Sequence, residues 1–265
     1  MNGARWLVLH ADDFGMSHSV NRATAQAFEH GWITSASILV PCPWFPEAAK
    51  FAREHPEVDL GVHLALNSEW TSLRWGPVAP RDRVPSLLDS EGYFPRLGRE
   101  VVEKARASEV EIELAAQVEK ARSAGISITH LDSHMGTLLG SPPLFAKLLE
   151  LTEVHRLPVR LAEPPTFSSP HPDLAKISSP PKWLDGCVEM GVGVPPDQWL
   201  DEYKYLLAPL PPGTYQLTVH LGYDDDEMRV RRPAIRIGVR PGDSAISTSF
   251  EVRRSRRFSA SRVSR

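Results

Sequence analysis

Residues 7–15 read LVLHADDFG, an apolar run that ends in two adjacent carboxylates, Asp12 and Asp13. The run at residues 6–10 is typical of a buried β-strand, and a helical pattern follows at residues 19–30. Two negative charges side by side at a strand end repel each other, so they require a nearby cation or a shared proton. A metal ion would meet this requirement, with one carboxylate binding it and the other free to transfer protons.

Strand and helix patterns alternate along the rest of the chain. The expected strands are residues 6–10, 34–40, 58–64, 126–131, 158–161 and 214–221, and the expected helices are residues 19–30, 44–54, 100–123, 143–154 and 198–207. Such alternation is typical of parallel strands joined by crossover helices, so we expect an α/β fold, either a barrel or a layered sheet. Ligands in these folds collect at the carboxyl ends of the strands.

Residues 67–97 form a long irregular stretch that is rich in Pro, Arg and Trp. Loops of this length in compact domains are usually functional or disordered. Trp70 and Trp75 would be unusual in a purely solvated loop. We therefore interpret this stretch as a substrate-binding flap whose aromatic side chains could stack on a substrate.

The composition is that of a globular protein, with 42% hydrophobic and 24% charged residues among 265. No apolar run reaches the roughly 18 residues of a membrane span, and residues 1–6 lack the apolar region of a signal peptide. Two cysteines, Cys42 and Cys187, form no disulfide framework. We therefore expect a cytoplasmic protein with no membrane partner.

Charge is distributed unevenly along the chain. Residues 229–265 contain 11 Arg against two acidic residues, a net charge of +9, so residues 1–228 carry −12 of the overall −3. We expect residues 1–228 to form the functional domain, and an acidic domain suits an enzyme better than a nucleic-acid binder. The Arg/Ser-rich tail could be a disordered extension or an arm for an acidic partner. Its abrupt loss of pattern favours a third reading, a frame-shifted or truncated end.

Histidines follow two further strands. His63 ends the stretch GVH at residues 61–63, while His130, Asp132 and His134 alternate, so an extended chain would point all three to one side. Each piece alone has a structural reading, such as a helix cap for the Asp pair or a buried core histidine for His63. Together they indicate an Asp/His/His metal site, whose open coordination positions are typical of catalysis.

A late strand ends at His220, which would place this histidine near the same edge. It could protonate a leaving group, or it could be a structural residue; the sequence favours neither. The acidic cluster at residues 224–227 reads as a solvated loop.

Three motifs carry a family resemblance: ADDFG at 11–15, GVHL at 61–64 and THLDSH at 129–134. They resemble the signatures of the YdjC-like carbohydrate deacetylases, a family that includes the chitooligosaccharide deacetylases, in the same order over about residues 5–223. The resemblance implies a distorted (β/α) barrel of about seven mostly parallel strands, of the NodB-like type. It also implies a metal-dependent hydrolase that removes N-acetyl groups from small amino-sugar substrates, and a homodimer.

Motif position also implies the role of each residue. Asp13, His63 and His134 would bind the metal, and Asp12 would be the catalytic base with His220 as the acid. Three residues would support these or contact substrate: His130, Asp132 and Arg160, the last of which could equally be a surface charge. The cofactor would be a divalent ion; the family suggests Mg, whereas nitrogen ligands favour Zn, Co, Ni or Fe.

The chain departs from many relatives at residues 135–138, where MGTL replaces further histidines. This difference leaves the substrate class open. The alternatives are a metal-dependent hydrolase of another amide, ester or phosphoester, and a non-catalytic sugar- or metal-binding protein. A spare carboxylate at Asp12 argues against the second, because binding alone does not need a base. Nucleic-acid binding depends on the tail only and is disfavoured.

Overall fold

The computed structural model describes residues 3–162, 184–191 and 194–230. Six strands form one sheet in the order β4-β3-β2-β1-β6-β5, and every neighbouring pair is parallel. The strands are β1 (Arg5–Phe14), β2 (Ser35–Ile38), β3 (Asp59–Leu64), β4 (Ile128–Ser133), β5 (Gly186–Glu189) and β6 (Gly213–His220). The predicted α/β fold with parallel strands is confirmed. The short strand expected at residues 158–161 is a single bridge from Val159 to Leu131.

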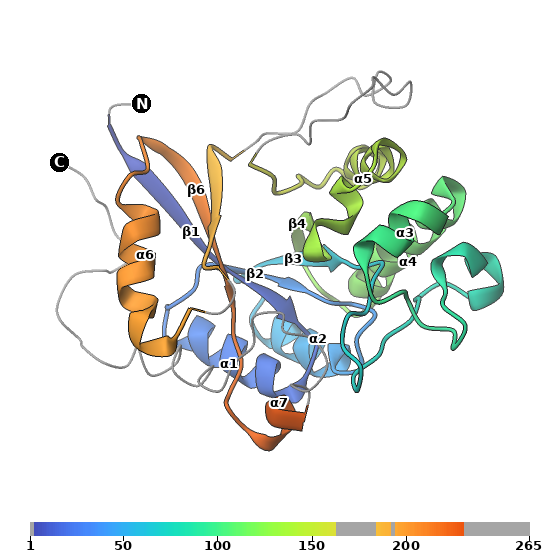
Figure 1. The fold of residues 1–265 in the computed structure, drawn as a ribbon, viewed down its shortest axis with the longest axis horizontal. Coiled ribbons are helices and arrows are strands. Elements are labelled where there is room, and N and C mark those ends of the chain that lie inside the picture. Colours follow the sequence, from blue (N-terminus) through green and yellow to red (C-terminus); the bar gives the residue numbers. More distant parts are fainter. Residues whose placement is uncertain (1–2, 163–183, 192–193, 231–265) are drawn as a thin grey trace.

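Helices follow the strands as the alternation predicted (Figure 1). They are α1 (His18–Glu29), α2 (Phe45–Glu54), α3 (Gly98–Lys104), α4 (Ala107–Ser123), α5 (Pro142–His155), α6 (Trp199–Leu207) and α7 (Asp226–Val230). In Figure 1, α1 and α2 lie together below the sheet, α3 to α5 lie near β3 and β4, and α6 lies beside β1 and β6. Among the described helices, none combines the length and apolar composition that a membrane span requires.

The two faces of the sheet differ in polarity, because side chains alternate along each strand. One face carries the apolar core, with fully buried residues such as Ala36, Val62 and Leu131. The other face is polar although it too is buried: His10 on β1 pairs in register with Ser35 on β2, and His63 on β3 with Asp132 on β4. Buried polar groups require partners, so this face depends on a continuous network of contacts.

Gly61 on β3 makes room for this polar face. A Cβ atom at this position would lie 2.3 Å from Nε2 of His130, whose ring is buried on the neighbouring strand. We predict that Gly61→Ala lowers the free energy of unfolding by about 1–3 kcal/mol, as overpacking in a core does. Urea denaturation measures the change. Gly191→Ala is the control, because a Cβ there meets no atom of the described residues within 4 Å; equal midpoints for the two variants would contradict the prediction.

The single helix predicted for residues 100–123 is wrong, because two helices, α3 and α4, occupy this stretch. The break lies at Ala105 and Arg106, which have extended backbone angles. Ser86 explains it: its hydroxyl accepts a hydrogen bond from the Arg106 amide at 2.9 Å, and its own amide donates to the Glu109 carboxylate at 2.6 Å. The segment before α3 therefore pins the start of α4.

The suggestion that aromatic side chains of the stretch 67–97 stack on a substrate does not hold for Trp70 and Trp75. Trp70 and Trp75 are buried, with exposed fractions of 8% and 2%, so neither ring is open for stacking on a substrate. Their burial shows that this stretch packs as part of the core. Strand β5 and helix α7, both short, were not predicted. The Pro/Ser-rich residues 164–181 and nearly all of the basic tail, from residue 231, lie outside the described residues.

Candidate metal centre

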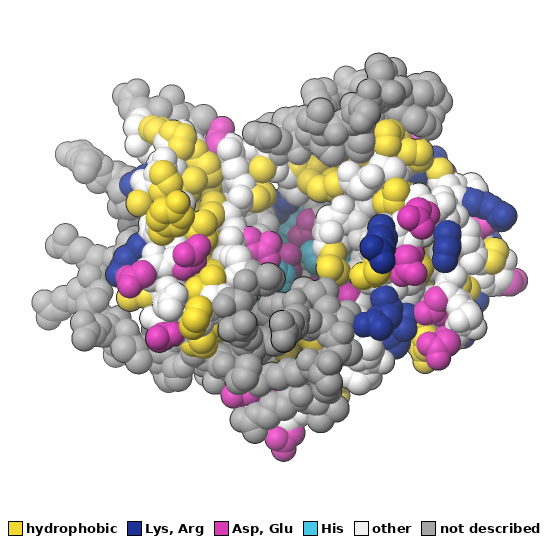
Figure 2. Space-filling view, in the orientation of Figure 1, with side chains coloured by type: hydrophobic (Ala, Val, Ile, Leu, Met, Phe, Trp, Pro, Cys, Tyr) yellow, Lys and Arg dark blue, Asp and Glu magenta, His cyan; other side chains and the backbone are white. Residues whose placement is uncertain are grey.

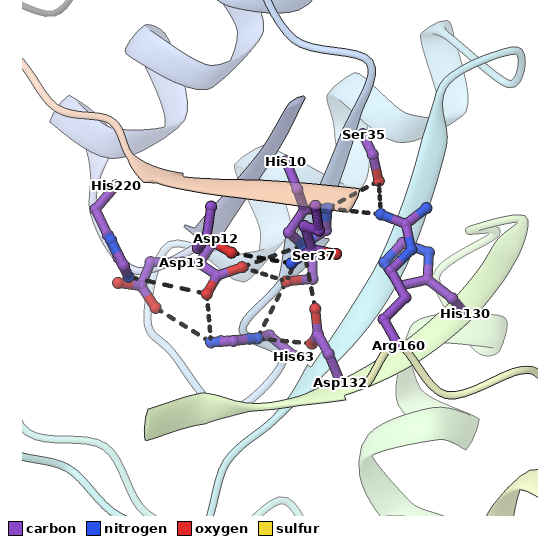
Figure 3. Close-up of polar contacts among 12 residues, drawn as sticks. His10, Asp12, Asp13, Ser35, Ser37, His63, His130, Asp132, Arg160 and His220 are labelled. Carbon is purple, nitrogen blue, oxygen red and sulfur yellow. Dashed lines mark hydrogen bonds and ion pairs between the residues drawn. The ribbon is translucent and has the colours of Figure 1, made fainter. Parts of the chain in front are cut away.

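The end of β1 turns two adjacent carboxylates to the same side. Consecutive strand residues normally point to opposite faces, but Asp13 has a φ of 67° and the pairing with β2 shifts register between Ala11 and Phe14. Aspartate is one of the few residues that adopts this left-handed conformation readily. As a result, both Asp12 and Asp13 point toward His63 from β3 (Figure 3).

Asp13, His63 and His134 form a buried group whose ligand atoms lie within 4.8 Å of one another. Oδ1 of Asp13 is 3.3 Å from Nδ1 of His134 and 3.6 Å from Nε2 of His63. Ligand atoms about 2.1 Å from a common ion lie roughly 3.0–3.4 Å apart, so these separations are close to those of a metal site. Oδ1 of Asp13 is also buried without a hydrogen-bond partner among the described residues. The group therefore fits a divalent ion.

Asp132 on β4 lies behind His63, where it was expected to orient the site. Nδ1 of His63 donates to Oδ1 of Asp132 at 2.7 Å. A carboxylate in this position fixes the tautomer of a metal-binding histidine, which leaves Nε2 of His63 facing Asp13.

Asp12 lies beside the group rather than in it. Its Oδ1 is 3.1 Å from Nε2 of His10 and accepts a longer hydrogen bond from Ser37. Its Oδ2 is 3.8 Å from Nε2 of both His63 and His220. One oxygen is thus anchored, and the other faces the candidate metal centre, where it can accept a proton.

His220 lies at the rim of the site. It pairs in register with Asp12 across β1 and β6, its side chain is 46% exposed, and its Nδ1 is 3.4 Å from Glu189 on β5. Figure 2 shows a hollow between the α6 side and the α3–α5 side of the molecule, with histidine and acidic side chains at its base. His220 is therefore placed where a substrate could reach it.

His10, which was not among the predicted site residues, joins the site to a second polar layer. Its Nε2 is 3.1 Å from both Asp12 and Asp132, and its Nδ1 accepts a hydrogen bond from Nη1 of Arg160 at 2.9 Å. Arg160 also pairs with Asp59, and His130 packs its ring against His10 at 5.3 Å. Arg160 and His130 therefore contact His10 and Asp59, and lie on the far side of His10 and Asp132 from the Asp13 group (Figure 3). The signal that could have revealed the role of His10 was its alternation with Asp12, because side chains two residues apart on a strand point to the same face.

Two other groups bring three ligand-type atoms equally close: Asp12, His63 and Asp132, and His10, His130 and Asp132. The first is less suited to one ion, because His63 and Asp132 are 2.7 Å apart, a hydrogen-bond distance. The second lies against the guanidinium of Arg160, a permanent positive charge that disfavours a cation. The Asp13 group is free of both difficulties.

The family model for YdjC-like proteins matches residues 6–257. The chain belongs to the YdjC-like family. This confirms the resemblance drawn from the three motifs.

Several relatives of this YdjC-like protein are named carbohydrate deacetylase. One, from Geobacillus stearothermophilus, is 37% identical over 167 residues, which cover 63% of this chain and 62% of the relative. Another, from Thermus thermophilus, is 36% identical over 236 residues, covering 86% and 82%. A solved structure from Enterococcus faecalis V583, named as a cellobiose-phosphate cleavage protein, shares the fold with a TM-score of 0.73. The two sequences are 24% identical, and the match covers 94% of this chain and 93% of that one.

Charge in the site of this YdjC-like protein is balanced by protonated histidines when no cation is bound. Burial opposes protonation of His63, but Asp132 and Asp12 outweigh it and raise its pKa to about 9. Burial likewise opposes protonation of His134, yet Glu69 and Asp13 raise its pKa well above the usual value. For Asp13, burial alone would raise the pKa, and contact with His134, His220 and His63 lowers it instead.

Metal binding should therefore release protons and strengthen as the pH rises. A histidine must be neutral to bind a metal, so below pH 9 an ion must displace the proton of His63. For each proton displaced, the apparent Kd falls about tenfold for every unit by which the pH rises. We predict at least a tenfold gain in Zn²⁺ affinity between pH 6.5 and 8. Isothermal titration in buffers of different protonation enthalpy measures the protons released. A Kd independent of pH in this range would contradict the prediction.

Stability without metal should change in the opposite direction. The folded pKa of His63, about 9, exceeds its unfolded value of about 6.5, so its contribution is complete below pH 6.5 and is lost as the pH rises through 9. The metal-free protein should thus lose thermal stability from pH 7 to 9, while the stabilisation by added Zn²⁺ grows. Thermal melts with and without a chelator test both trends.

Proposed function

We propose that this YdjC-like protein is a metal-dependent deacetylase that removes N-acetyl groups from amino-sugar substrates of the chitooligosaccharide type. One observation carries the proposal: Asp12, a carboxylate whose Oδ2 faces His63 and His220 at 3.8 Å, lies beside a buried Asp/His/His group that fits a divalent ion. A binding protein has no need of the extra carboxylate, whereas a hydrolase needs a base. The names of the relatives support the same reaction.

The geometry supports a separate catalytic role for each residue of the site. Asp13, His63 and His134 would hold a divalent ion, which when bound supplies a Lewis acid to polarise the acetamide carbonyl and lowers the pKa of water. Asp12 accepts a proton from the attacking water at Oδ2. His220, at the rim, gives a proton to the amine nitrogen as the C–N bond breaks. Acetate and a free amino sugar leave.

The ligand set also bears on the metal. Two imidazole nitrogens and one carboxylate oxygen suit Zn, Co, Ni or Fe better than Mg, which prefers oxygen ligands. We infer that Zn²⁺ or Co²⁺ supports turnover better than Mg²⁺ at equal occupancy. Activity of the chelator-treated protein after addition of each metal in turn measures this preference.

Acetate release tests the proposal. The substrates are N-acetylglucosamine and its β-1,4-linked dimer and trimer, with an acetyl ester and a phosphomonoester as alternatives, each with chelator and with metal restored. The proposal expects acetate from at least one amino sugar, loss with chelator and recovery with metal. Hydrolysis of the ester or phosphoester alone would reassign the substrate, and activity unaffected by the chelator would remove the metal from the mechanism.

A further inference from the structure

Glu69 is a buried carboxylate that the motifs do not include. It lies at the start of the irregular stretch 67–97 and is 5% exposed. Its Oε2 accepts a hydrogen bond from Nε2 of His134 at 2.9 Å and a weaker one from the Asn67 amide at 3.4 Å. Arg96 contacts only the backbone oxygen of Glu69. The carboxylate of Glu69 is therefore directed at His134, 65 residues away in the chain.

This contact determines which nitrogen of His134 faces the candidate metal centre. An imidazole that donates Nε2–H to Glu69 presents the lone pair of Nδ1 on its other side, and Nδ1 is the atom that lies 3.3 Å from Asp13. The arrangement mirrors that of His63, whose Nδ1 donates to Asp132 and whose Nε2 faces Asp13. Each histidine thus has one carboxylate behind it, but the two present opposite nitrogens.

The surrounding segment holds Glu69 in place. Asn67 accepts a hydrogen bond from Thr137 at 2.7 Å through its side chain and another from the Trp75 indole at 2.9 Å through its backbone oxygen. The Trp75 ring is buried and forms a T-shaped pair with the His134 ring at a centroid distance of 5.8 Å. Thr137 belongs to the same 3-10 turn as His134. The stretch 67–75 is therefore held against the turn that carries His134, by the Thr137 hydrogen bond and by the Trp75 ring.

We propose that Glu69 is a positioning residue that orients His134 for metal binding through Nδ1, an inference that rests on the proposed metal-dependent function. Glu69 is not itself a ligand, because its carboxylate lies on the Nε2 side of the ring, opposite the Asp13 group. A hydrogen-bonded carboxylate behind a metal-binding histidine fixes the ring and raises its basicity, and its loss typically weakens metal binding about 10–100-fold.

Chelator competition with Zn²⁺ tests the assignment on the full chain at pH 8. Glu69→Ala should weaken Zn²⁺ binding about 10–100-fold. Glu69→Gln should cost less, because its amide oxygen still accepts Nε2–H, but it should bind more weakly than the control. Glu91→Gln is that control, since Glu91 lies in the same stretch with a 72% exposed side chain. A Kd for Glu69→Gln equal to that of the control, or for folded Glu69→Ala equal to wild type, would overturn the inference.

The nitrogen of His134 that binds the ion gives a second readout. Imidazole ¹⁵N chemical shifts of the Zn²⁺-loaded protein should show Nδ1 of His134 bound and Nε2 protonated, and the opposite assignment would overturn the inference. Neither readout uses a sugar. Zn²⁺ binding that depends on Glu69 without acetate release would therefore defeat the proposed function alone. Acetate release with Zn²⁺ binding independent of Glu69 would defeat only the inference, and a wild-type protein that binds no Zn²⁺ would defeat both.

Discussion

Replacing Asp12 with asparagine should lower kcat by about 10²–10⁴-fold, the contribution typical of a general base, while the Kd for metal changes less than about threefold. Asparagine has nearly the same shape and keeps an oxygen near His10 and Ser37, which contact Oδ1 of Asp12. It cannot accept the proton of the attacking water. Steady-state acetate release and chelator competition on the same preparation measure the two quantities.

Asp82→Asn is a suitable control, because it makes the same change at an exposed position, in the 3-10 turn Arg81–Arg83 and outside the candidate site. It should leave both kcat and metal binding unchanged. An Asp12→Asn variant that turns over at the wild-type rate would remove Asp12 as the base, and one that loses the metal would make it a ligand.

Replacing Asp13 with asparagine should give a different result, because Asp13 belongs to the proposed ligand group with His63 and His134. If Asp13 is a ligand as proposed, metal affinity should fall by more than the roughly 100-fold upper value for an outer hydrogen-bond partner, and activity should fall with it. Asparagine also tolerates the left-handed backbone of this position, so the loss would reflect the charge and not the fold. Metal content after dialysis measures the effect.

The two neighbouring substitutions form a matched pair. Each exchanges one carboxylate for an amide, one residue apart, yet the first should leave metal affinity nearly unchanged and the second should lower it by more than about 100-fold. High metal occupancy in the Asp13→Asn protein would contradict the assignment of this residue as a ligand.

Much of the candidate site was predictable because it lies where parallel strands end. Asp13 and His63 lie in the last residues of β1 and β3, and His134 directly follows β4. The carboxyl ends of these parallel strands meet at one edge of the sheet. His10 was missed because it stands inside an apolar run and resembles a core residue. Glu69 was missed for a different reason: its contact with His134 joins segments 65 residues apart, and no local pattern carries that information.

The fold was predictable to a similar extent. Periodicity predicted most of the strands and helices, since it reflects which side chains face the core. It could not predict the break before α4, because this break depends on hydrogen bonds from Ser86, which lies 20 residues earlier. Nor could it predict that Trp70 and Trp75 are buried, since that depends on how an irregular segment packs against α4 and the turn at His134.

Anomalous diffraction from a crystal soaked in Zn²⁺ tests the central claim most directly, because it locates the ion without reference to any substrate. We expect one strong peak about 2.0–2.2 Å from Oδ1 of Asp13, Nε2 of His63 and Nδ1 of His134. A peak among His10, His130 and Asp132 instead, or no peak within reach of Asp13, would contradict it.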